Sequence, residues 1–153
     1  MTIKRRQARE WAVQMLVAAD LNPVAGVDRL IDDFWAQRAT LDEEDGGLEG
    51  DVGKKMREFA NVRVRGVMEK REAIDAEISS LLENWDLFRL GTVERAVLRM
   101  GVWELENCPD VPPKVVINEA IDLVNWFASP KSRALVNGVL DKVAKGLQNA
   151  DGQ

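Results

Sequence analysis

The stretch TVERAVLRMGVWELEN, residues 92–107, decides the fold of this chain. Its apolar residues are Val93, Ala96, Val97, Leu98, Met100, Val102, Trp103 and Leu105, and they occur almost all round a helix of this length. A helix that is hydrophobic on nearly every side is normally buried among other helices. We therefore expect residues 92–107 to form the central helix of a helical bundle.

Helical patterns lie on both sides of this segment. Apolar residues recur at three- and four-residue spacing, which is the period of a helix with one buried face. Helices are expected at about residues 3–20, 24–39, 54–69, 71–84, 92–107, 113–127 and 132–148. Asn22-Pro23 ends the first helix, and Pro112-Pro113 starts the sixth, because proline suits the beginning of a helix. No convincing strand pattern occurs, so the predicted fold class is all-α, a compact bundle of seven helices.

Residues 40–53 differ in composition from the helical segments. They contain six carboxylates among four glycines and no lysine or arginine. Such a segment buries little apolar surface and favours turns, so we expect an acidic, mobile surface loop. We expect no domain boundary there, because the two helices before it are too few to form a core alone. One domain is therefore expected over residues 1–153.

The composition excludes several classes of protein. The chain has 153 residues, no histidine and one cysteine, Cys108. The commonest general base and zinc ligand is therefore missing, and an internal disulfide is excluded. Glu104 and Glu106 are expected on different faces of their helix, so they form no acid–base couple. We expect a cytoplasmic protein with no catalytic residue, no metal, no cofactor and, since no segment has about 18 consecutive apolar residues, no membrane partner.

The beginning of the first helix is strongly basic, with Lys4, Arg5, Arg6 and Arg9. The three arginines fall within about 100° of one another on a helix. Helix starts prefer acidic residues, so cations in this position need compensation. Arginines on one sector can follow phosphates and stack on bases, and the pattern therefore favours RNA binding. The alternative is a solvated face, neutralised by Glu10 or by a neighbouring helix.

The five tryptophans are interpreted by their place on the helical stripes. Trp35, Trp85 and Trp103 lie on core stripes and are expected to pack inside the protein. Trp11 and Trp126 lie near stripe edges, and both are candidates for an interface.

Two polar pairs interrupt apolar helices, and both are interpreted as structural. Asn118-Glu119 and Asn137-Gly138 are expected to be buried, with the polar side chains hydrogen-bonded between helices. Gly101 and Gly138 are expected to let neighbouring helices approach closely.

Five stretches carry a resemblance to a known family. They are RRQAREWAVQ (5–14), NWDLFRL (84–90), VERAVLR (93–99), DVPPKVVINEA (110–120) and VNGVLD (136–141). In this order, and over nearly the full chain, they resemble the bacterial NusB family; only the loop around residues 42–51 looks idiosyncratic. The resemblance implies a compact fold of seven helices in two packed helical subdomains.

The resemblance also implies a function. It implies a heterodimer with the small ribosomal subunit protein that doubles as Nus factor E. The pair would bind the boxA element of nascent transcripts, chiefly ribosomal RNA leaders, help the RNA polymerase elongation complex pass terminators, and support ribosome biogenesis. In the family the arginine-rich helix start contacts RNA, which corresponds to Lys4, Arg5, Arg6 and Arg9. The acid of the Val-Glu-Arg motif lies on the partner-protein surface, which corresponds to Glu94.

The chain departs from the family pattern at three positions. Val17 stands where an aromatic residue is common, and Ala134 and Leu135 stand where a basic residue and Phe are usual. Aromatic residues at such places can stack on unpaired bases, each worth about 1–3 kcal/mol. Their loss predicts weaker or differently specified RNA binding. Lys131 and Arg133, in the turn before the last helix, are predicted to bind RNA and to replace part of the lost contacts.

Two other functions are consistent with parts of the pattern. NusB-like helical domains also precede a ribosomal RNA cytosine methyltransferase domain, but that enzyme needs a Gly-rich βαβ unit and a much longer chain. This chain would then be at most a detached domain. The other alternative is a protein-interaction module with weakened or lost RNA binding, which the missing aromatic residues support. A homodimer of the free protein that covers the basic face is left open.

Overall fold

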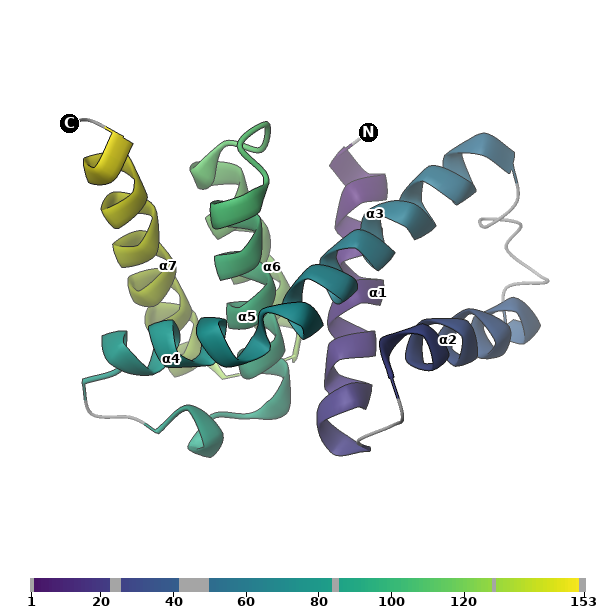
Figure 1. The fold of residues 1–153 in the computed structure, drawn as a ribbon, viewed down its shortest axis with the longest axis horizontal. Coiled ribbons are helices and arrows are strands. Elements are labelled where there is room, and N and C mark those ends of the chain that lie inside the picture. The colour runs from purple at the N-terminus through teal and green to yellow at the C-terminus, as the bar shows by residue number, and fades with distance from the viewer. Residues whose placement is uncertain (1, 23–25, 42–49, 84–85, 128, 152–153) are drawn as a thin grey trace. The chain divides into compact units, whose positions relative to one another are not determined.

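The structure, a computed structural model, describes residues 2–22, 26–41, 50–83, 86–127 and 129–151. Over these ranges it contains seven α-helices, one short 3-10 helix and no strand (Figure 1). The elements are α1 (Thr2–Leu21), α2 (Val27–Leu41), α3 (Gly50–Glu69), α4 (Arg71–Leu81), η2 (Leu87–Arg89), α5 (Thr92–Asn107), α6 (Pro113–Phe127) and α7 (Pro130–Asp151). The predicted all-α fold of seven helices is confirmed.

Several helix boundaries differ from the expected ones. α2 extends through Leu41 and α3 begins at Gly50, so both ends of the expected acidic loop are helical. Composition mispredicts this boundary because glycine only weakens a helix and does not end it. Residues 42–49, the middle of that loop, lie outside the described residues. α7 begins two residues early, since Pro130 takes the first helical position, where a missing N–H group costs little.

η2 has no counterpart among the helices expected from the sequence. Its first turn is set by Asp86, whose Oδ1 accepts a hydrogen bond from the backbone N–H of Phe88 at 3.0 Å. A short acidic side chain that binds its own backbone two residues on is a common way to start a turn. Trp85, which was expected to pack in the core, lies outside the described residues.

Contacts between residues divide the chain into two compact units. Unit 1 is Met1–Met68 and unit 2 is Glu69–Gln153, so the division falls at the end of α3. The expectation of one domain over residues 1–153 stays a prediction.

Unit 1 has an aromatic cluster between α1 and α2, in which Trp11 is buried and Phe34 and Trp35 are half-buried. The rings of Trp11 and Trp35 meet edge to face with centroids 5.3 Å apart, and Phe34 packs against Trp35 in the same manner. The indole Nε1 of Trp35 donates a hydrogen bond to Asn61 Oδ1 of α3 at 2.8 Å. Trp11 is only 6% exposed, so it belongs to the core and not to an exposed interface.

Unit 2 is organised around α5, as expected from its sequence. Nine consecutive residues, from Ala96 to Glu104, are buried, and α5 contacts α4, α6 and α7. Consecutive burial places residues on every side of the helix, so α5 is the central helix of this unit.

The buried face of α5 includes a charge that is neutralised within unit 2. Arg99 is 3% exposed, and its Nε and Nη2 donate to the two carboxylate oxygens of Asp75 at 2.7 and 3.0 Å. Two parallel hydrogen bonds of this kind are the strong geometry for a guanidinium and a carboxylate. The pair joins α5 to α4.

The two glycines that were expected to permit close helix contact behave differently. A Cβ atom on Gly101 would lie 2.9 Å from both Cδ atoms of Leu140 on α7, so the close approach is confirmed there. A Cβ on Gly138 would meet nothing within 4 Å, so the expectation for Gly138 is wrong. Gly138 faces outward on α7, where no helix lies against it within the described residues.

The polar residues that were expected to be buried, Asn118, Glu119 and Asn137, differ in their exposure. Glu119 is buried, as expected, and it has an interaction partner. Asn118 and Asn137 are exposed, so the expectation of buried amides is wrong for both. The cause is the helical period, since a residue next to a buried one in sequence is turned by about 100° from it.

Two carboxylates of unit 2 share a hydrogen bond. Partial desolvation of the carboxyl group is the largest cause that raises the pKa of Glu106 to about 7. The hydrogen bond with Glu77 and the repulsion from its charge act in the same direction, and the attraction to Lys70 opposes them. Glu104 is 1% exposed while Glu106 is exposed, so the two acids of α5 lie on different faces, as expected.

Alanine substitution at the two glycines tests the packing of α7 on α5. Gly101→Ala should lower the free energy of unfolding by about 1–2 kcal/mol, because the added methyl overpacks against fully buried Leu140. Gly138→Ala should raise it by about 0.5–1 kcal/mol, since alanine favours helix and has open space there. Urea denaturation of both variants gives the values, and equal effects would contradict the packing described.

The shared proton of Glu106 makes stability depend on pH. A carboxyl whose pKa rises from 4.5 to about 7 on folding stabilises the folded state below pH 4.5, and this contribution is lost as pH rises through 7. Glu106→Gln should therefore be more stable than the wild type at pH 8, by less than about 1 kcal/mol because solvent screens the pair. Glu77→Gln should act in the same direction. Thermal unfolding between pH 4 and 8 measures this, and unchanged profiles would refute it.

Candidate functional site

The basic start of α1 is partly exposed and partly buried. Lys4 and Arg5 are exposed, and Arg6 is half-buried with an interaction partner. Arg9 is only 3% exposed and also has a partner. The predicted RNA contact of Arg9 would therefore require its side chain to leave this packing.

The ring of Phe59 on α3 organises three guanidinium groups. The Cζ of Arg63 lies 3.4 Å from the ring centroid, that of Arg9 lies at 5.1 Å and that of Arg5 at 5.6 Å. Cations over an aromatic face are stabilised by about 0.5–2 kcal/mol, more strongly when they are shielded from water. Phe59 thus ties the amino end of α1 to α3 within unit 1.

Sequence reasoning missed Phe59 and Arg63. Their four-residue spacing places them on one face of α3, but nothing in it indicates that α1 brings two further arginines to the same ring. A tertiary contact was needed to identify this cluster.

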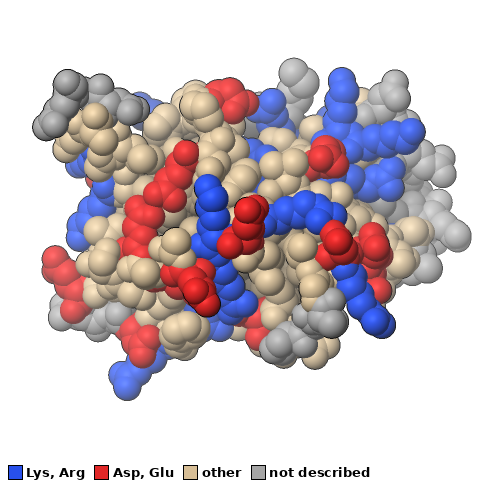
Figure 2. Space-filling model, in the orientation of Figure 1, with Lys and Arg blue, Asp and Glu red and all other residues tan. Residues whose placement is uncertain are grey.

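Further cations lie at the beginning of α3. Lys54 and Lys55 are exposed, Arg57 is half-buried, and none of the three makes an ion pair with a described residue. Figure 2 shows Lys and Arg side chains gathered over the region where Figure 1 draws the first half of α3. Unit 1 therefore presents positive charge from both α1 and α3, although the whole chain carries a net charge of −5.

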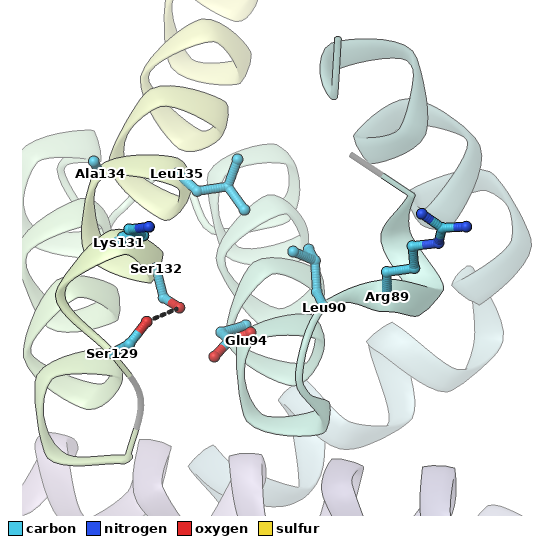
Figure 3. Close-up of a pocket in the computed structure, with 8 residues that line it drawn as sticks. All are labelled: Arg89, Leu90, Glu94, Ser129, Lys131, Ser132, Ala134 and Leu135. Carbon is cyan, nitrogen blue, oxygen red and sulfur yellow. Dashed lines mark hydrogen bonds between the residues drawn. The ribbon is translucent and has the colours of Figure 1, made fainter. Parts of the chain in front are cut away.

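A cavity of about 520 Å³ lies in unit 2, beside the beginnings of α5 and α7 (Figure 3). It is lined by Arg89, Leu90, Glu94, Ser129, Lys131, Ser132, Ala134 and Leu135. The cavity thus brings Glu94, predicted to bind a protein, next to Lys131, predicted to bind RNA. Arg133 is exposed on α7 and does not line the cavity.

Glu94 is held in place by the start of its own helix. Its Oε2 accepts a hydrogen bond from the backbone N–H of Gly91 at 2.6 Å, which caps α5. The next residue, Arg95, donates from Nη1 to the carbonyl oxygens of Leu90 at 2.7 Å and Phe88 at 3.1 Å. The Glu-Arg pair therefore fixes the backbone before α5, and with it one wall of the cavity.

The walls of the cavity differ in polarity. Leu90 and Leu135 are apolar, while Ser129 and Ser132 lie with their hydroxyl oxygens 3.3 Å apart (Figure 3). Phe88, beside this wall, is 66% exposed and had not been singled out from the sequence. A mixed apolar and charged surface of this kind suits a protein partner.

Within the described residues, no three Cys, Asp or Glu side chains lie close enough to hold a metal ion. Across the same ranges, no helix combines the length and the hydrophobicity of a membrane span.

Comparison with known proteins places the chain in a family. Residues 6–145 match the model of the NusB family. The transcription antitermination protein NusB of Anaeromyxobacter dehalogenans (strain 2CP-1) is 42% identical over 150 residues, which cover 98% of this chain and 96% of that protein.

Solved structures agree with this match. T. maritima NusB superposes with a TM-score of 0.77 at 31% identity, covering 92% of this chain and 90% of that one. A structure of the antitermination factors NusB and NusE in complex with dsRNA contains a chain with a TM-score of 0.77 at 29% identity, covering 95% and 99%. The expectation of a non-enzymatic protein is confirmed by the same matches, since NusB is an antitermination factor. This chain belongs to the NusB family.

Proposed function

We propose that this chain is a transcription antitermination adapter that binds boxA-type RNA of ribosomal RNA leaders together with a small ribosomal subunit protein, Nus factor E. Through this pair it acts indirectly on the RNA polymerase elongation complex and supports ribosome biogenesis. Its place of action is the cytoplasm, where transcripts are made. A related structure in which NusB, NusE and dsRNA occur together supports the pairing of the two partners.

The observation that carries the RNA half of the proposal is the exposed basic start of α1. Lys4 and Arg5 are exposed, and neither makes an ion pair with a described residue. Cations without a carboxylate partner are available to phosphate groups, and contacts to phosphate supply most of the affinity of such proteins. The ring of Phe59 holds the Arg5 guanidinium on one side, which limits its freedom before RNA arrives.

Arg9 takes a different part in this proposal. Because it is buried, its first role is to join α1 to α3 through Phe59. The RNA surface of unit 1 then consists of Lys4, Arg5 and Arg6, and in unit 2 the exposed Lys131 and Arg133 serve the same ligand.

The protein half of the proposal rests on Glu94. The carboxylate of Glu94 lines an open cavity, and its hydrogen bond at the start of α5 already fixes its position. Binding of a partner would therefore cost this side chain little conformational entropy. Apolar Leu90 and Leu135 beside it add surface for a protein contact.

Removing two cations from α1 tests the RNA surface. Lys4→Gln with Arg5→Gln should weaken binding of boxA RNA by about 10- to 100-fold, since two charge-assisted contacts are lost. The slope of log K against log salt should fall by roughly 1.4, or about 0.7 for each phosphate released from single-stranded RNA. Fluorescence anisotropy of labelled RNA at several salt concentrations measures both values.

The matched control removes the same charge elsewhere. Arg29→Gln with Lys142→Gln changes two exposed cations, on α2 and α7, and should leave RNA affinity within about twofold. If both double variants weakened binding equally, the effect would come from total charge and the assigned surface would be wrong. Binding that neither double variant alters would favour an interaction module without this RNA surface.

A second substitution tests the protein surface. Glu94→Gln keeps a side chain that can cap α5 and removes its charge, so the free energy of unfolding should change by less than about 0.5 kcal/mol. Affinity for the ribosomal protein should fall by about tenfold or more, as for a charge on a protein interface. Isothermal titration calorimetry with the purified partner gives the affinity. Unchanged affinity in the folded variant would remove Glu94 from the interface.

A further inference from the structure

Trp126 is the most exposed of the large apolar side chains described in the structure, at 78%. It lies near the end of α6, whose buried face is formed by Val116, Ala120, Leu123 and Val124. The indole makes no ring contact and no hydrogen bond with any described residue. Trp126 therefore contributes little to the core, and its ring is available to a ligand.

The segment around Trp126 has an unusual charge. Acidic residues are 26 of 153, or about one in six, so an 18-residue stretch should contain about three. Residues 123–140 are 18 residues long and contain none, while they include Lys131 and Arg133. The net charge of this stretch is therefore +2 in a chain whose net charge is −5.

The two cations are exposed and follow Trp126 closely in the sequence. Neither Lys131 nor Arg133 makes an ion pair with a described residue. Lys131 follows Trp126 by five residues, so their Cα atoms are at most about 18 Å apart. α7 itself contains no aromatic residue, so the exposed ring nearest to Lys131 and Arg133 in the sequence is that of Trp126 on α6.

We propose that Trp126 stacks on an unpaired base of single-stranded RNA whose phosphates contact Lys131 and Arg133. An exposed aromatic ring beside unpaired cations is the usual means of holding a single strand, because every base offers a face and every linkage a negative charge. The local charge of +2 favours RNA as the stacking partner over a patch of a protein, because RNA supplies a negatively charged phosphate at each nucleotide. This inference rests on the proposed function and adds a residue to its RNA surface.

The test uses the full chain and a labelled single-stranded boxA RNA, with a scrambled RNA of equal length. Trp126→Ala should weaken binding by about 5- to 150-fold, the loss expected for one stacked base. Trp126→Phe should restore most of the affinity, since a smaller ring still stacks. Neither variant should change the slope of log K against log salt, because no phosphate contact is removed. Lys131→Gln with Arg133→Gln should lower that slope.

Val115→Ala is the matched control, since it removes an exposed apolar side chain from the same helix without removing a ring. It should bind RNA as the wild type does. Wild-type affinity in folded Trp126→Ala would overturn this inference and leave the proposed function standing. The inference would also be overturned if Trp126→Ala bound RNA normally but bound the ribosomal protein more weakly, since the ring would then belong to a protein contact. Failure of the wild type to bind either RNA would refute the proposed function as well.

Discussion

The burial of α5 is the constraint on which unit 2 depends. A helix buried from Ala96 to Glu104 needs a neighbour on every side, and α4, α6 and α7 supply them. The charge on Arg99 is buried only together with Asp75, because an uncompensated guanidinium in the interior would cost several kcal/mol (~3–5 by removal of one partner). The bidentate pair thus sets how α4 lies on α5, while Gly101 sets how closely α7 approaches.

In unit 1, several guanidinium groups lie against an aromatic ring. The ring of Phe59 gathers Arg5, Arg9 and Arg63, and aromatic packing of Trp11 on Trp35 joins α1 to α2. An aromatic face stabilises a cation without neutralising it. The exposed end of α1 can therefore keep the charge that a phosphate-bearing partner needs, while the same helix forms part of a core.

The side chains near the start of α5 both fix the backbone and line the cavity of unit 2. Glu94 caps the helix and faces the cavity, and Arg95 fixes the backbone that carries Leu90. A residue held in this way loses little conformational freedom on binding. Under the proposed function, the Val-Glu-Arg sequence would serve both the start of α5 and the contact with the partner protein. Gln at position 94 separates the two roles, because it can still cap the helix but carries no charge.

The amino-acid sequence alone was enough to predict the helices and the central position of residues 92–107, because apolar periodicity and proline placement are local properties. It also identified the family and the basic end of α1. Three features depend on how the helices pack and could not be predicted: Arg9 is buried, Trp126 is exposed whereas Trp11 is not, and a Cβ on Gly101 would meet Leu140 while one on Gly138 would meet no described atom within 4 Å. A helical stripe defines which residues share a face, but the depth of each residue depends on the helix that lies opposite, and no local pattern encodes that contact.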